Sequence, residues 1–215
     1  MIWPRLLRAV LPQRAVVYDD SFFREQWFHS WDALQHVLGR LIMSEPRWRR
    51  VLDFGCGPGI MIDAMRERGL SYVGCDYAEE ARALYLARFG AHPEAYVASL
   101  SAVDPADFDL FLSFDVFEHM TDVQIDAVLE TVRPIPDLLL NISRDWRTPG
   151  HINLKSDRAW LRLFRRHGLR LQDDTTRRLR DLYVDLRPGR PDAWDRNLFV
   201  LTRPARTGGA GRSAP

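Results

Sequence analysis

Short apolar runs alternate with amphipathic segments along the chain from about residue 50. The runs "RRVLDF", "SYVGCD", "EAYVAS", "FDLFLSF" and "DLLLNIS" are typical of buried strands, and helical patterns follow most of them. Thr121 and Ser156 stand where two of these helices would need N-caps. Strands and helices alternating at this spacing predict a parallel sheet with helices on both faces and right-handed crossovers.

The C-terminal part of the chain does not follow this alternation of strands and helices. The segments "LRLQDDTTRRLRDLYVDLR" and "RNLFVLTR" both look like strands, and "PGRPDAWD" joins them without a helix between. This pattern predicts a hairpin, so the last strand should enter the sheet antiparallel. The arginine-rich run 177–180 is expected on the solvated side of the first of these strands.

The length of 215 residues suits one domain with a sizeable core. "SWDALQHVLGRLI" places apolar residues on one helical face before the first strand, so we expect residues 1–45 to form a helical lead-in or lid. Residues 46–203 would form the main α/β domain. Residues 204–215 carry little that could be buried and are expected to be a disordered tail.

Composition narrows the possible functions. A net charge of +1 provides no field that would attract nucleic acid, and no segment reaches the ~20 apolar residues that span a bilayer. Cys56 and Cys75 have no metal-type spacing and are expected to be small packed thiols, which favours a reducing cytoplasm. We therefore predict a cytoplasmic protein with no nucleic-acid partner, no stable membrane insertion and no metal; the oligomeric state stays open.

Candidate chemistry begins at the stretch "VLDFGCGPGIMIDAM". Gly55, Gly57 and Gly59 lie between a buried strand and a helix, where bare backbone lets a ligand approach and free amides favour negative charge. Dinucleotide-binding proteins use G-x-G-x-x-G at such a turn, but Ile60 stands where the third of those glycines would be. The spacing thus argues against a nicotinamide-dependent oxidoreductase, which we keep as an alternative.

Two acidic residues indicate a different ligand. Asp53 precedes the turn and suits a ligand with an ammonium group, whereas it would repel a pyrophosphate. Asp76 ends the next strand and could accept hydrogen bonds from both hydroxyls of a ribose, although it could also cap the following helix. A nucleoside with a cationic amino-acid tail fits this pattern, and S-adenosylmethionine is such a molecule.

The chain resembles the class I S-adenosylmethionine-dependent methyltransferases. The resemblance lies in "VLDFGCGPG", "YVGCDY" and "FDLFLSFDVFEHM", in the right order, and extends over roughly residues 18–203. The last string is similar to a signature of small-molecule methyltransferases, including the ubiquinone-biosynthesis type. This resemblance implies a Rossmann-like α/β fold with a seven-stranded sheet in the order 3-2-1-4-5-7-6 and strand 7 antiparallel.

The resemblance also implies site residues. The turn with Asp53 would hold the methionine moiety, Asp76 the ribose and Tyr77 the adenine. Ser99 stands where family members often carry an acid, so adenine recognition is expected to rely on the Leu100 backbone. The full set of expected cofactor-binding residues is Asp53, Gly55, Cys56, Gly57, Gly59, Asp76, Tyr77, Ser99, Leu100 and Asp115.

The expected reaction is methyl transfer to a small molecule, with oxygen preferred as the acceptor by analogy with the group. A hydroxyl acceptor needs a base, and His119 and His151 are the candidates, although either could be purely structural. A methyltransferase-like binding protein without turnover is the other alternative that the sequence leaves open.

Overall fold

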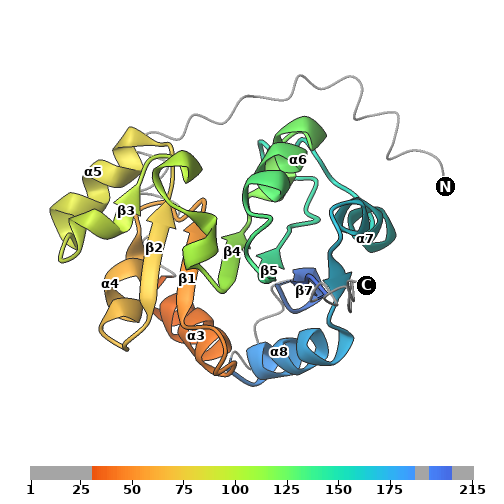
Figure 1. The fold of residues 1–215 in the computed structure, drawn as a ribbon, viewed down its shortest axis with the longest axis horizontal. Coiled ribbons are helices and arrows are strands. Elements are labelled where there is room, and N and C mark those ends of the chain that lie inside the picture. Colours follow the sequence, from red (N-terminus) through yellow and green to blue (C-terminus); the bar gives the residue numbers. More distant parts are fainter. Residues whose placement is uncertain (1–30, 187–193, 205–215) are drawn as a thin grey trace, which may run out of the picture.

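The structure, a computed structural model, describes residues 31–186 and 194–204. Its centre is a seven-stranded sheet in the order β3-β2-β1-β4-β5-β7-β6 (Figure 1). The pairs among β1 to β5 are parallel, and β7 runs antiparallel to both β5 and β6. The predicted order and the reversed strand are confirmed. The strands are β1 Arg50–Phe54, β2 Ser71–Cys75, β3 Tyr96–Val97, β4 Leu110–Phe114, β5 Asp137–Asn141, β6 Arg170–Leu171 and β7 Leu198–Thr202.

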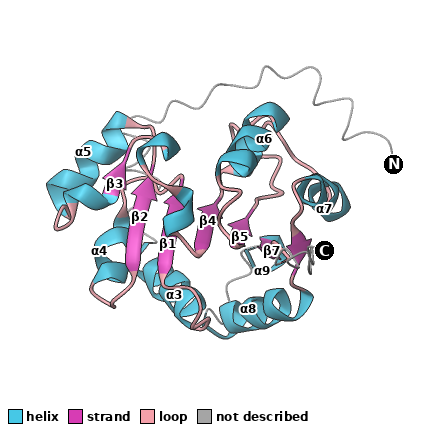
Figure 2. Cartoon of the chain, viewed as in Figure 1, coloured by secondary structure: helices cyan, strands magenta, loops and turns pink. Residues whose placement is uncertain are grey.

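Helices lie on both faces of this sheet (Figure 2). Thr121 caps α6 through a capping box with Gln124, and Ser156 caps α7 by accepting from the Ala159 amide, as expected. The α-helices are α3 Trp31–Met43, α4 Ile60–Arg66, α5 Glu79–Arg88, α6 Asp122–Thr131, α7 Asp157–Arg166, α8 Asp173–Leu186 and α9 Trp194–Asn197. Short 3₁₀ helices are η2 Pro93–Ala95, η3 Leu100–Ala102, η4 Pro105–Asp107 and η5 Phe117–His119.

The strands bury side chains on both faces and so create two hydrophobic cores. Val51 packs into the core that includes α3, α4 and α8, whereas its neighbour Leu52 packs into the core that includes α6 and α7. Leu139 and Leu138 divide in the same way on β5. This explains why these strands read as continuous apolar runs: helices cover both sides of the sheet.

The C-terminal prediction was wrong in one respect. The segment read as a long strand is a two-residue β6 followed by α8, and the hairpin therefore contains a helix. Thr176, Leu179 and Tyr183 are the buried side chains of α8, at helical spacings of three and four. The arginine run lies on this helix, where Arg178 pairs with Glu45 instead of lining a strand.

The boundaries of the chain are described only in part. Val37, Leu38, Leu41 and Ile42 of α3 are buried, as the lead-in pattern predicts. Residues 1–30 of the expected lead-in and 205–215 of the expected tail lie outside the described residues, so the proposed division of the chain stays a prediction. Within the ranges that the structure describes, no helix combines the length and apolar character needed to cross a bilayer.

Candidate active site

A cavity of about 480 Å³ lies at the carboxyl ends of β1, β2 and β4. Its size is within the range of small-molecule sites, and this edge of an open parallel sheet is where such folds bind ligands. The cavity is lined by every expected cofactor-binding residue except Gly59, and by His119. Sequence reasoning missed its apolar walls, among them Leu38 from α3 and Met120, because no motif marks them.

The glycine turn borders the cavity with bare backbone. Gly55 has a φ of 76°, and a Cβ there would lie 2.3 Å from Cγ2 of Val116. Gly59 has a φ of 66°, and a Cβ there would lie 2.9 Å from the ring of Tyr85. Gly55 thus keeps the turn close to the segment after β4, while Gly59 allows packing behind the turn.

Asp76 connects the turn to the end of β2. Its Oδ2 accepts from the Gly57 amide at 2.9 Å, and its Oδ1 accepts from the Ala78 amide at 2.9 Å. Burial raises the pKa of this carboxyl, and the backbone donors oppose the rise. The backbone of Tyr77 is a third donor to this carboxylate. A carboxylate can accept about four hydrogen bonds, so Asp76 can orient the turn and also receive a ligand hydroxyl.

Asp53 lines the cavity and is otherwise buried. The hydroxyl of Tyr72 donates to its Oδ2 at 2.8 Å. Burial raises the pKa of Asp53 to about 7; the Tyr72 bond lowers it and the charge of Asp76 raises it further. The role of Tyr72 was not predicted, and its only signal is a hydroxyl within an otherwise apolar strand.

The far end of the cofactor region is open. Tyr77 is 76% exposed, so a ligand can lie against its ring. Ser99 caps η3: its Oγ accepts from the Ser101 amide at 3.2 Å and is 2.9 Å from the Ser101 hydroxyl. Leu100 is partly buried against the core. Cys56 and Cys75 are both free, and burial raises the pKa of each thiol, which keeps them protonated at neutral pH.

Asp115 follows β4 and has a φ of 54°, which is rare for a residue other than glycine. Its amide donates to the Asn141 carbonyl at 2.9 Å, and its Oδ1 accepts from the Asn141 side chain at 3.1 Å. Strained backbone of this kind is found at functional sites where the surroundings hold it in place. Here β5 holds the carboxylate at the cavity wall.

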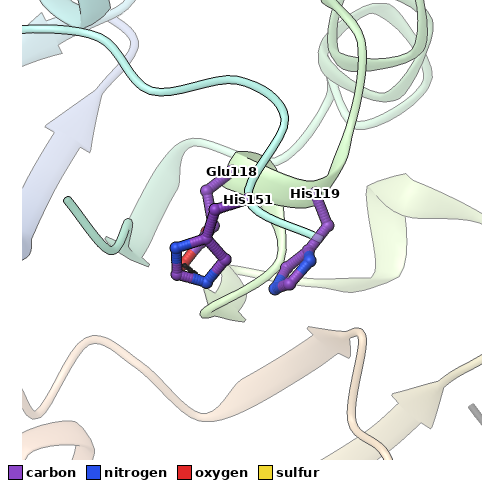
Figure 3. Close-up of side chains that lie close together, drawn as sticks. All are labelled: Glu118, His119 and His151. Atoms are coloured by element: carbon purple, nitrogen blue, oxygen red, sulfur yellow. Dashed lines mark ion pairs between the residues drawn. The ribbon is translucent and has the colours of Figure 1, made fainter. Parts of the chain in front are cut away.

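The two histidines lie beside each other at the other end of the site (Figure 3). The ring of His119, from η5, meets the ring of His151, from the loop after β5, edge-on at 4.6 Å between centroids. The carboxylate of Glu118 lies behind His151, and Nε2 of His151 is 3.9 Å from its Oε1. His119 lines the cavity, whereas His151 does not.

Burial controls the protonation of this group. Burial, reinforced by His151, lowers the pKa of His119 to about 4, and burial also lowers the pKa of His151. Nδ1 of His151 lies 2.6 Å from the Asp145 carbonyl and must therefore carry the proton. Glu118 is fully buried, and burial together with the charge of Asp115 raises its pKa well above the usual value.

The loop that carries His151 is fixed to the segment after β4. The Asn153 amide donates to the Glu118 carbonyl at 2.9 Å, and the Asn153 side chain donates to the Met120 carbonyl at 2.8 Å. The Ser143 amide donates to Oε1 of Glu118 at 2.8 Å. These bonds position two histidines from distant parts of the chain, a proximity that the sequence alone did not reveal.

A family model described as "Methyltransferase domain" matches residues 23–173, which is more than half of the chain. The chain belongs to this methyltransferase family. The resemblance to class I S-adenosylmethionine-dependent methyltransferases is thereby confirmed, and S-adenosylmethionine is the cofactor of the family. The cavity fits this group, because it combines the bare glycine turn with the two acids that the sequence analysis connected to the amino-acid tail and the ribose.

Curated relatives of this methyltransferase match over a shorter stretch. The chain is 34% identical over 97 residues to a ubiquinone biosynthesis O-methyltransferase of Paracidovorax citrulli and 33% identical over 96 residues to one of Leptothrix cholodnii. Each match covers 40% of this chain and 40% of the relative. The chain therefore matches well under half the length of these relatives.

Solved structures share the fold over most of the methyltransferase. A TehB-like SAM-dependent methyltransferase from Corynebacterium glutamicum has a TM-score of 0.59 at 20% identity, covering 86% of this chain and 98% of the other. A SAM-dependent methyltransferase from Archaeoglobus fulgidus has a TM-score of 0.58 at 15% identity, with 85% and 98% covered. At these identities the likeness establishes the fold alone.

Proposed function

We propose that this chain transfers the methyl group of S-adenosylmethionine to an oxygen atom of a small molecule in a biosynthetic pathway. The observation that carries the proposal is one cavity that is lined by Asp76, by the glycine turn and by His119. The curated relatives are O-methyltransferases, which supports oxygen as the acceptor. When bound, the cofactor supplies an already activated methyl group, so the protein mainly provides position and a dry site.

Two acids would hold the polar parts of the cofactor. Asp76 keeps acceptor capacity beyond its bonds to the backbone, which suits a ribose hydroxyl. Asp53 would pair with the ammonium of the methionine moiety beside the Gly55–Gly59 turn. Because the pKa of Asp53 is about 7, an approaching ammonium would favour its ionised form, and binding would then release a proton.

The adenine would occupy the open end of the cavity. Tyr77 offers an exposed ring face, and Leu100 offers an apolar side chain with its backbone. The Ser99 hydroxyl is already bonded to Ser101, so it would add at most an uncharged bond. Asp115, held by Asn141 on the cavity wall, would contact the cofactor or the acceptor.

The acceptor hydroxyl would lie beside His119, the histidine that lines the cavity. A neutral imidazole has a free lone pair that can accept a proton. His151 would position His119 through the edge-on ring contact and would not itself meet the acceptor. We place the reaction in the cytoplasm, since the two cysteines are free thiols.

Transfer of labelled methyl groups tests this function. The full chain would be incubated with S-adenosylmethionine carrying a tritiated methyl group and a panel of phenols, catechols and carboxylates. Label on a phenol or catechol, absent with Asp76→Ala, supports O-methylation. Tight S-adenosylhomocysteine binding without label on any acceptor or on cell extract supports the non-catalytic alternative, and binding of a nicotinamide cofactor instead rejects the proposal.

A further inference from the structure

Glu118 has an unusual environment for a carboxylate. Its side chain is completely buried, and Oε1 accepts from the Ser143 amide. Among the described residues, Oε2 has no hydrogen-bond partner. A buried carboxylate oxygen without a partner is costly, so such an atom indicates that something else binds there.

Two imidazoles lie close to the carboxylate of Glu118. Because Nδ1 of His151 donates to the Asp145 carbonyl, Nε2 is left as its unprotonated nitrogen, and it faces Glu118. A histidine oriented by a backbone carbonyl in this way is the usual arrangement of a metal ligand. His119 is hydrogen-bonded to the backbone of Gly150, which orients the second imidazole similarly.

The geometry points to a metal ion: we propose that Glu118, His119 and His151 together bind one divalent first-row transition-metal ion such as Zn²⁺. Their ligand atoms all lie within 4.8 Å of one another (Figure 3). Zinc–ligand bonds of about 2.0–2.2 Å require these atoms to lie about 3.3 Å apart, so each side chain needs to move by about an ångström or less. Two imidazoles with one carboxylate favour this class of ion over Mg²⁺ and Ca²⁺, which prefer oxygen ligands.

The position of the site gives the ion a role. His119 lines the cavity, whereas Glu118 and His151 are buried and do not line it, so three protein ligands would leave an open coordination position toward the acceptor. A hydroxyl bound there would have a lowered pKa and would release its proton to solvent, with the electron pair remaining on oxygen. This role rests on the proposed methyl transfer, whereas the existence of the site does not. With the ion bound, the available lone pair of His119 would be a metal ligand, so the ion and not His119 would activate the hydroxyl.

The sequence analysis predicted no metal, and this proposal departs from that expectation. The proposed ligands come from two segments more than 30 residues apart. Glu118 and His119 lie in the first segment, and His151 lies in the second. Only the fold of the loop after β5 brings His151 to the other two. A pairwise motif search could not have found this set.

Zinc titration of the metal-stripped full chain tests the proposal. Competition with a chromophoric chelator should show one Zn²⁺ per wild-type chain, weakened at least 100-fold by Glu118→Gln, which can keep the Ser143 bond, and by His119→Asn on the cavity rim. Co²⁺ should give a ligand-field spectrum that both variants lose. His92→Asn, on an exposed segment away from the cavity, is the matched control and should bind zinc as the wild type does.

Circular dichroism and thermal unfolding would show that each variant is folded; if Glu118→Gln is not, His119→Asn carries the test. Equal zinc affinity in all three variants, or displacement of zinc by an equal concentration of Mg²⁺, would overturn the site. S-adenosylhomocysteine binding would be measured in parallel with chelator present. If the wild-type chain binds zinc but not S-adenosylhomocysteine, the proposed function is contradicted and the metal site is supported. If it binds S-adenosylhomocysteine but not zinc, only the metal site is contradicted.

Discussion

The two parts of the site, which we call the glycine-turn half and the histidine half, are built differently. In the glycine-turn half (Asp53, the turn Gly55–Gly59, and Asp76) the carboxylates receive hydrogen bonds from groups only 19 residues away in the chain. In the histidine half (Glu118, His119 and His151) the side chains come from two distant segments, and Oε2 of Glu118 has no partner among the described residues. The carboxylates of the glycine-turn half have hydrogen-bond donors from the chain itself. The histidine half contains a buried acceptor that is available to a further partner.

This contrast has a physical reason. Binding a cofactor that is the same in every turnover requires a preformed, satisfied surface, because any reorganisation would reduce affinity. Acting on an acceptor requires groups whose bonding capacity is available at the reacting atom. Changes in the glycine-turn half should therefore alter binding or stability, and changes in the histidine half should alter turnover.

The largest effect is expected at the turn itself. Gly55→Ala should lower the free energy of unfolding by about 3 kcal/mol, because a left-handed φ and the contact with Val116 both oppose a Cβ. Gly69→Ala is the matched control: Gly69 has a similar φ of 82° with no atom within 4 Å, so strain alone should cost about 1–2 kcal/mol. Equal losses in urea denaturation would show that Val116 does not confine the turn.

The next effect concerns turnover. His119→Asn should reduce methyl transfer by about 100-fold or more, because the group that we propose beside the acceptor is lost. Affinity for S-adenosylhomocysteine should stay within about twofold of wild type, since His119 is not one of the residues expected to bind the cofactor. Calorimetry measures the cofactor affinity and an initial-rate assay measures the turnover. A parallel loss of cofactor affinity in this variant would contradict the distinction between the two halves.

A smaller effect is expected at the ribose position. Asp76→Asn should weaken S-adenosylhomocysteine binding by about tenfold, because one charge-assisted bond is worth about 1.5 kcal/mol or more. Asparagine can still accept from one backbone amide, whereas Asp76→Ala would also release the bonds to Gly57 and Ala78. Unchanged calorimetric affinity in the asparagine variant would reject the ribose role.

The smallest effect is a pH dependence from Asp53. With a pKa of about 7, its ionised fraction rises about eightfold between pH 6.0 and pH 7.5, so S-adenosylmethionine affinity should rise by about the same factor. The carboxyl binds a proton more tightly in the folded chain than in the unfolded one, so its contribution to stability decreases as pH rises from about 4 to 7. Asp53→Asn should flatten both profiles; a rising affinity that persists in this variant assigns the titration to another group.

Local signals predicted most of the fold, because each depends on residues close in sequence. Thr121 and Ser156 were recognised as caps from the residues that follow them, and both cap their helices. The segment of α8 was misread because charged residues interrupt its apolar pattern: the buried Leu179 and Tyr183 lie at helical spacing among arginines and aspartates. Tertiary contacts with the core decide the structure of such a segment, and the sequence pattern does not contain them.

The site divides in the same way. The position of the glycine turn and Asp76 at the cavity could be predicted because these residues belong to one continuous strand–turn–helix–strand unit. The bond from Tyr72 to Asp53 depends on the register between β1 and β2, and the meeting of His119 with His151 depends on a loop more than 30 residues away. Neither the register of the strands nor the position of the loop can be inferred from the spacing of residues in the sequence. These two contacts therefore require the three-dimensional structure.

A crystal structure of the full chain with S-adenosylhomocysteine tests the central claim most directly. We predict the ribose hydroxyls within hydrogen-bond distance of Asp76, the amino-acid tail beside Asp53 and the turn, and the sulfur directed toward His119. A nucleoside bound elsewhere, or an empty cavity at saturating ligand, would contradict the account.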